Sequence, residues 1–308
     1  MSSPEVAEAK SLISRREFVD LTKRQSPFRY ARILLLWGIK VVLVFLIAPR
    51  MPWFIWPILA LVSIGVVEGL RNWSHESLHH RVFANQRIVN SLLTRFFLSL
   101  PIITPYTTRL KMHLSHHRNP NLDSDRERFA WQTEMNKKWL LKELLLSLTG
   151  AKFIRGALSA READSNREGN QMLELALLLV YFFSVFLSLF LVGYLIEYIA
   201  LWILPQIFIS PVVNQVRSYA EHGGTGERPI SRTTIAGFLE RLFLYQVHFG
   251  YHFEHHVWPS IPENNLPRVH QLLKQRGFWD RHPDLVQGSG VMRLVSAIPL
   301  APAVNAAS

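Results

Sequence analysis

The sequence predicts an all-α integral membrane protein with four transmembrane helices, a re-entrant or interfacial segment and a cytoplasmic helical domain. Three observations support this class: 49% of the 308 residues are apolar, the mean hydropathy is positive, and apolar stretches alternate with basic ones. A helix needs about 20 mostly apolar residues to cross a bilayer. Residues 172–213 hold only two charged side chains, Glu174 and Glu197, so this run is long enough for two spans. A soluble protein of this size could hardly enclose it.

The predicted spans form two hairpins. A Pro-Arg-Met-Pro turn at residues 49–52 separates the first two spans, and a turn near Gly193 separates the last two. Trp53, Trp56 and Trp202 are expected at the membrane interface, where tryptophan is enriched. The four predicted spans are residues 33–49, 53–70, 172–192 and 195–213.

Residues 88–110 are apolar but are interrupted by Arg95, Pro101 and Pro105. If this segment crossed the bilayer once, the histidines before and after it would lie on opposite sides of the membrane. We therefore expect it to dip in and return, or to lie along the interface. Irregular backbone at that depth is tolerated where protein buries it.

The net charge of +11 follows the distribution expected of a membrane protein. Residues 1–32 carry seven Lys or Arg and residues 109–168 carry twelve, whereas the two loops expected outside carry one between them. Because Lys and Arg collect on the cytoplasmic side, both termini are predicted to be cytoplasmic. No recognition motif accompanies the charge, so nucleic-acid binding is not expected. We expect a cytoplasmic segment at 1–32, one membrane domain at 33–298 and a flexible tail at 299–308.

Eleven of the thirteen histidines fall in four short windows beside the apolar stretches. Helical residues three and four apart share one face, so each of the three larger windows can direct two or three imidazoles at one point. Imidazole suits iron, copper, zinc and nickel. A structural zinc site is closed by four ligands, and these windows supply about twice that number, so we expect two metals. The windows are residues 75–80, 113–117, 221–222 and 248–256.

The three larger windows, in this order and with these flanking spans, resemble the histidine boxes of the integral-membrane fatty acid desaturase family. Its superfamily also contains alkane hydroxylases, carotenoid hydroxylases and carotenoid ketolases. The resemblance covers roughly residues 55–280. It is most specific at His113–His117, followed by Asn121 and Asp123–Asp125, and at Gly250–Pro259, followed by Leu266–His270. The resemblance implies two non-haem iron ions, dioxygen as cosubstrate and an external electron supply.

Carrying the family's ligands over by position gives nine histidines. They are His75, His79, His113, His116, His117, His222, His252, His255 and His256. The first box leaves an alternative, because His80 could replace His79. Further ligands or hydrogen-bond partners of the ligands are expected among His248, Glu76, Asp125, Glu221 and Glu254, since ligating histidines usually donate their second N–H to a carboxylate or carbonyl. His270 and His282 lie outside every box and are expected to be structural.

The leading hypothesis is therefore a desaturase that acts on a fatty acyl or lipid chain. A hydroxylase or ketolase of a lipid or carotenoid is the alternative on the same scaffold. The non-enzyme alternative, a membrane metal transporter, would place its ligands inside the spans, and the predicted spans contain no histidine. The sequence holds no cysteine cluster, GxGxxG or His-Pro-Gly-Gly motif. We therefore expect a separate electron donor, such as a ferredoxin or a cytochrome b5-like protein, and a location in a bacterial plasma membrane.

Overall fold

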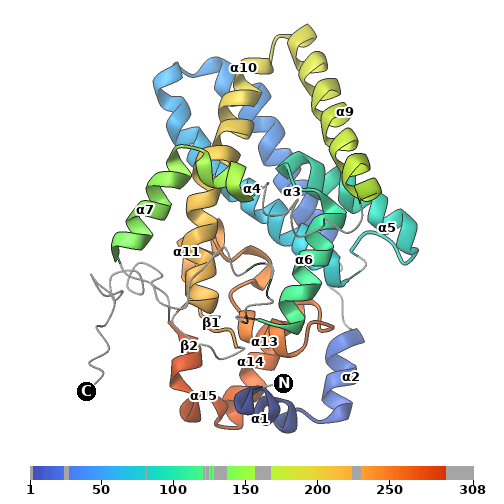
Figure 1. Cartoon of the computed structure of the whole chain (residues 1–308), viewed down its shortest axis with the longest axis vertical. Helices are drawn as coiled ribbons and strands as arrows, with labels where there is room; N and C mark the ends of the chain where they lie inside the picture. Colours follow the sequence, from blue (N-terminus) through green and yellow to red (C-terminus); the bar gives the residue numbers. More distant parts are fainter. Residues whose placement is uncertain are drawn as a thin grey trace. The chain divides into compact units, whose positions relative to one another are not determined.

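The computed structural model describes residues 3–23, 28–80, 82–120, 122, 125, 127, 137–156, 168–223 and 230–288. The tail predicted at 299–308 lies outside the described residues. The chain divides into two compact units. Unit 1 comprises Met1–Gln25, His113–Lys152 and Pro211–Ser308, and unit 2 comprises Ser26–Met112 and Phe153–Ser210. Figure 1 labels most helices of both units.

The predicted fold class is confirmed. Over the described ranges, four helices are long and apolar enough to cross a membrane, and one bent helix pair accompanies them. The only strands among the described residues are β1 (Thr233–Thr234) and β2 (Val286–Gln287), which pair in parallel. The four long helices are Arg29–Arg50, Trp53–His79, Met172–Val192 and Leu195–His222.

Unit 2 is built around the long apolar helices. It contains α3 (Arg29–Val41), α4 (Trp56–His79), α5 (Arg87–Thr94), α9 (Glu168–Val192) and α10 (Leu195–Tyr198). Wider π-helical turns occur at Val42–Ile47, Arg95–Ser99, Ile199–Ile203 and Pro205–Ile209, and 3₁₀ turns at Ala48–Arg50, Trp53–Ile55 and Leu100–Ile102. Two helices, α6 (Tyr106–Arg118) and α11 (Ser210–His222), run from the end of unit 2 into unit 1.

Polar contacts join the apolar helices of unit 2. Glu68 is fully buried and accepts a hydrogen bond from the Ser210 hydroxyl, and Arg71 donates to the same hydroxyl at 3.1 Å. Trp202, expected at the membrane interface, is instead fully buried. Its indole N–H donates to the Pro101 carbonyl at 2.8 Å, because that carbonyl lies where the helix ends and needs a donor.

The apolar segment at residues 88–110 forms parts of two helices that meet at a sharp bend. The helix pair Arg87–Ile102 and Tyr106–Arg118 bends by 92°. At the break, Ile103 adopts a left-handed conformation with φ of 53°. The buried Glu174 carboxylate stabilises this bend, because it accepts hydrogen bonds from the Tyr106 backbone N–H at 3.1 Å and from Arg95 at 2.9 Å.

Unit 1 gathers segments that are distant in sequence. Its helices are α1 (Pro4–Leu12), α2 (Arg15–Lys23), α7 (Lys137–Leu148), α12 (Phe238–Phe243), α13 (His252–Val257), α14 (Leu266–Gln275) and α15 (Phe278–Arg281), with 3₁₀ turns at Gln246–His248, Glu263–Asn265 and Pro283–Leu285. The N-terminal segment forms two short helices, and α1 packs on α13 (Figure 1). The core of this unit surrounds Phe253, whose ring lies 5.3 Å from Phe278 and 5.4 Å from Trp279.

Candidate metal centre

Four histidines of unit 1 meet at one point. His252 and His256 lie one turn apart on α13, His116 lies near the end of α6, and His222 is the last residue of α11. Their Nε2 atoms are separated by 2.9 Å (His222 to His252), 3.1 Å (His252 to His256) and 3.2 Å (His116 to His256). Three of the four side chains are buried and the fourth, His256, is partly buried.

These distances suit ligands that share one ion. With metal–nitrogen bonds of about 2.1 Å, two nitrogens at a right angle lie roughly 3.0 Å apart, and at a tetrahedral angle roughly 3.4 Å. The donor set is all imidazole nitrogen, which suits iron, copper, zinc or nickel. The residues present therefore fit a transition-metal ion.

A second group in unit 1 adjoins the first. The Nε2 atom of His117 lies 2.9 Å from that of His113 and 3.0 Å from that of His255. The ring of His117 stacks on that of His256 with centroids 4.3 Å apart, so the two groups are in direct contact through these imidazoles. This arrangement can hold two ions side by side.

The first histidine box belongs to unit 2. His75 and His79 lie one turn apart at the end of α4, with ring centroids 5.3 Å apart. His80 follows the helix as its cap residue, and its Nε2 lies 3.7 Å from Glu76. The carboxylate of Glu76 thus lies beside the histidine that was the alternative ligand.

Two carboxylates contact the outer nitrogens of histidines in the centre. The Nδ1–H of His116 donates to Asp125 at 2.8 Å, and both side chains are buried. The bond that was expected of Asp125 is therefore present. Glu127, which sequence reasoning missed, lies 3.5 Å from Nδ1 of His113. The sequence feature that could have identified Glu127 is its position two residues after Asp125. Asn121, Asp123 and Ser124 of the same motif lie outside the described residues.

Electrostatics favours neutral imidazoles at His252 and His256 of the four-histidine group. Burial, followed by neighbouring histidines, lowers the pKa of His256 well below its usual range, and burial does the same to the pKa of His252. Burial alone would also lower the pKa of His116, but the hydrogen bond to Asp125 and the charges of Glu127 and Asp125 raise it. Neutral imidazole is the form that binds a metal.

Glu254 has contacts different from those expected of it. Glu254 is fully buried, but it accepts hydrogen bonds from His270 Nδ1 at 2.6 Å and from the Thr233 hydroxyl. The reason is its position on α13, two residues and therefore about 200° away from both His252 and His256. His270 also stacks on Trp279, with ring centroids 4.8 Å apart, so it is part of the packing of α14.

Glu221 and His248 also depart from the expected contacts. Glu221 lies 3.7 Å from Nε2 of His252, the inward-facing nitrogen, instead of from an outer Nδ1. Its other oxygen lies 3.5 Å from Arg217. His248 has its Nδ1 3.3 Å from Glu263, because a left-handed backbone at Val247 and His248 turns the chain before α13 begins.

Comparisons with known proteins agree with this centre. The family model described as fatty acid desaturase matches residues 50–286. The chain is 24% identical to the zeaxanthin 4-ketolase of Chlamydomonas reinhardtii over 241 residues, which cover 73% of this chain and 49% of the ketolase. It is 21% identical to the dihydrorhizobitoxine desaturase of Bradyrhizobium elkanii over 243 residues, covering 72% and 69%. It is 28% identical to the human sphingolipid delta(4)-desaturase/C4-monooxygenase DES2 over 231 residues, covering 68% and 62%. The chain thus spans about half the length of the ketolase.

Proposed function

We propose that this chain introduces a C=C bond into the alkyl chain of a fatty acyl group or lipid. The chain belongs to the fatty acid desaturase family and is a multi-pass membrane oxidoreductase. The observation that carries the proposal is the pair of adjoining histidine groups in unit 1, built from buried and partly buried imidazoles with inward nitrogens 2.9–3.2 Å apart. The proposed cofactor is a pair of non-haem iron ions.

The proposed ligand set has nine histidines. His116, His222, His252 and His256 would hold one ion, and His113, His117 and His255 would hold the other. We propose that His75 and His79 of unit 2 complete the second set, with His79 in preference to His80. This choice is supported by the positions in α4: His75 and His79 lie one turn apart with ring centroids 5.3 Å apart, whereas His80 is the cap residue after the helix.

The iron pair would supply the oxidising power that no side chain has, with dioxygen as the cosubstrate. In the overall reaction, two adjacent methylenes each lose one hydrogen, and dioxygen takes up these hydrogens together with two electrons and two protons to give two waters. The chain's own residues hold and orient the site. Burial keeps His252 and His256 neutral, and Asp125 fixes the ring of His116 with its Nε2 directed inward.

A hydroxylase or ketolase is the second candidate function. Two relatives favour it, because their names describe a ketolase and a desaturase that is also a monooxygenase. On the same centre, one atom of dioxygen would enter a C–H bond, and the other would leave as water after taking up two electrons and two protons. A ketolase would repeat this step at the same carbon, and the resulting diol would lose water. The outcome depends on how the alkyl chain lies against the metals, so lipids and carotenoids both belong in the test.

We further propose that the metal centre and both termini face the cytoplasm of a bacterial plasma membrane. The support is the excess of Lys and Arg in residues 1–32 and 109–168. Electrons would come from a separate ferredoxin or cytochrome b5-like protein. Acidic surfaces are suited to dock on such a basic face.

The test is expression of the chain in a host, followed by mass spectrometry of its lipids and metal analysis of the purified protein. A desaturase yields products that have lost two hydrogens, and a hydroxylase yields products that have gained one oxygen. Two iron ions per chain are expected. His116→Ala should remove product and bound iron, whereas His282→Ala, a histidine outside the groups that pairs with Glu8, should retain both. Full activity and iron content in His116→Ala would refute the site.

A further inference from the structure

Helix α7 in unit 1 has its polar side inward and its apolar side outward. Glu143 and Ser147, one turn apart, are 6% and 0% exposed. On the opposite side, Leu141, Leu145 and Leu148 are 59%, 54% and 57% exposed. A helix on the surface of a water-soluble protein shows the reverse pattern. The outer leucines therefore need an apolar partner.

The inner side of α7 is held by polar contacts. Glu143 accepts a hydrogen bond from Lys152 Nζ at 3.0 Å, and Lys152 also donates to Gln215 on α11. The Ser147 hydroxyl donates to the Glu143 carbonyl at 2.8 Å. The two contacts of Lys152 fix which side of α7 faces outward. They also connect α7 to the helix that ends on His222.

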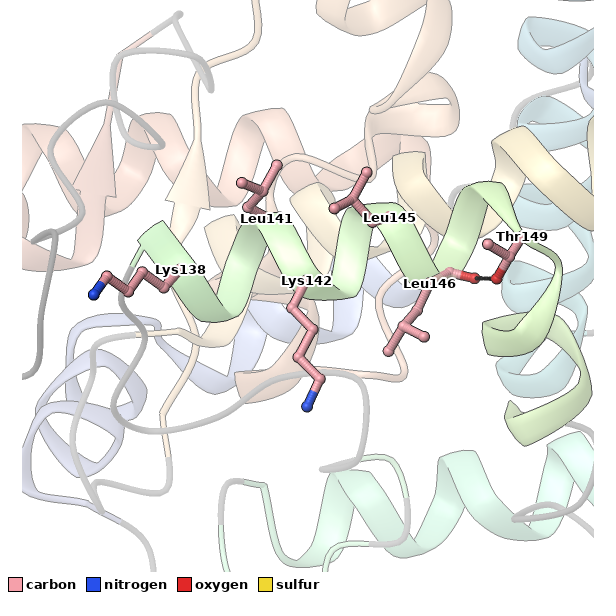
Figure 2. A pocket seen from close by; sticks show the side chains of 6 residues that line it. All are labelled: Lys138, Leu141, Lys142, Leu145, Leu146 and Thr149. Atoms are coloured by element: carbon pink, nitrogen blue, oxygen red, sulfur yellow. Dashed lines mark hydrogen bonds between the residues drawn. The ribbon is translucent and has the colours of Figure 1, made fainter.

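Lysines accompany the outer leucines at one end of the helix. Figure 2 shows Leu141 and Leu145 projecting to the same side of α7, Lys138 near the start of the helix, and Lys142 pointing away from that side. The first turn of α7 carries Lys137 and Lys138 and no acidic residue. Positive charge at a helix N-terminus opposes the helix dipole, so these lysines do not serve the stability of the helix. An anionic partner would neutralise them.

We propose that α7 lies in the interface of an anionic lipid bilayer, with its leucines among the upper acyl chains and its lysines at the headgroups. A bilayer surface offers an apolar layer and anionic groups in one partner, as interfacial helices with Leu on one side and Lys on the other require. The inference goes beyond the proposed reaction and does not depend on it. Because Lys152 joins Glu143 of α7 to Gln215 of α11, an α7 bound to the membrane would support the helix that ends at His222.

The chain has no cysteine, so single-cysteine variants can be spin-labelled at one position each. Full-length L141C, L145C and K138C, with K274C on α14 as the exposed control, are reconstituted in nanodiscs of phosphatidylcholine with or without phosphatidylglycerol. Collision with dioxygen reports the bilayer, and collision with a water-soluble nickel chelate reports water. Iron content is measured on the same samples, so failure of this inference is distinguishable from failure of the metal centre.

Labels at positions 141 and 145 are expected about 5–10 Å below the headgroup level, with the label at 138 at or above that level and the label at 274 in water. Phosphatidylglycerol should deepen the label at 145, and the K137Q/K138Q/K142Q variant should remove that deepening. Nickel accessibility at 145 equal to that at 274 would overturn the inference. Protection of 145 from both reagents would also overturn it, because it would indicate a protein partner or a second copy.

Discussion

Asp125 offers the sharpest test of the metal centre, because one oxygen of its buried carboxylate accepts the Nδ1–H of His116 at 2.8 Å while the other accepts the Glu127 backbone N–H at 2.9 Å. In Asp125→Asn, the amide oxygen can keep the backbone bond only if its NH₂ group faces Nδ1. His116 must then carry its proton on Nε2, the nitrogen that lies 3.2 Å from Nε2 of His256. A protonated Nε2 cannot bind a metal.

The expected loss for Asp125→Asn is about 10- to 100-fold in iron affinity, which corresponds to about 1.4–2.8 kcal/mol. The upper half of this range is expected, because both side chains are buried and the hydrogen bond is not screened by water. Asp125→Ala should lose less, since it does not impose the wrong tautomer.

Anaerobic titration of the metal-free protein with Fe²⁺ against a competing chelator measures the affinity, and product formation measures the consequence. Glu127→Gln is the matched control, because Glu127 lies at 3.5 Å from His113 and its side chain is 27% exposed. Its loss should be less than about tenfold. Wild-type iron affinity in Asp125→Asn would refute the role assigned to this carboxylate.

Three further predictions concern the scaffold. Phe253→Ala should destabilise unit 1 by about 3–5 kcal/mol, since the side chain is fully buried against Phe278 and Trp279; thermal unfolding checks this, with Phe253→Leu as the milder control, and an unchanged midpoint would contradict it. Glu174→Gln should weaken the start of α6 by about 1–3 kcal/mol, because it removes the charge that Arg95 and the Tyr106 N–H contact; faster hydrogen exchange at residues 104–108 is expected, and unchanged exchange would contradict it. Arg276 and Ser14 lower the pKa of Glu17 from 4.5 to about 2. Because the folded-state pKa is the lower one, the stabilisation is complete above about pH 4.5 and is lost as the pH falls towards 2, and it is worth about 1 kcal/mol or less for this partly exposed pair. Pepsin cleavage of residues 1–23 should therefore be faster in Glu17→Gln than in the wild type at pH 5 but equal at pH 2. Equal rates at pH 5 would contradict the stabilising role of the Glu17–Arg276 pair.

The meeting of histidines within the second and third boxes was predictable from spacing alone. Residues three and four apart on a helix share a face, so the sequence by itself places His252 and His256 together. The partners of the carboxylates were not predictable in the same way. Glu254 binds His270, sixteen residues away, and Glu174 binds the backbone of Tyr106, 68 residues away. Such contacts depend on how distant segments pack, and no local pattern specifies that.

The lengths of the membrane helices show a second limit of sequence reasoning, and it has a functional consequence. Hydropathy ended the second span at residue 70 and the fourth at 213, because the sequence becomes polar there. The helices continue to His79 and His222, since their backbone hydrogen bonds do not depend on side-chain polarity. The extensions hold the histidines: His75 and His79 end α4, and His222 ends α11. A continuous helix is more rigid than a loop, so each of these proposed ligands is held by the helix on which it lies. The change from apolar to polar sequence thus marks the point where each helix stops being apolar enough for a membrane and begins to carry the proposed metal ligands.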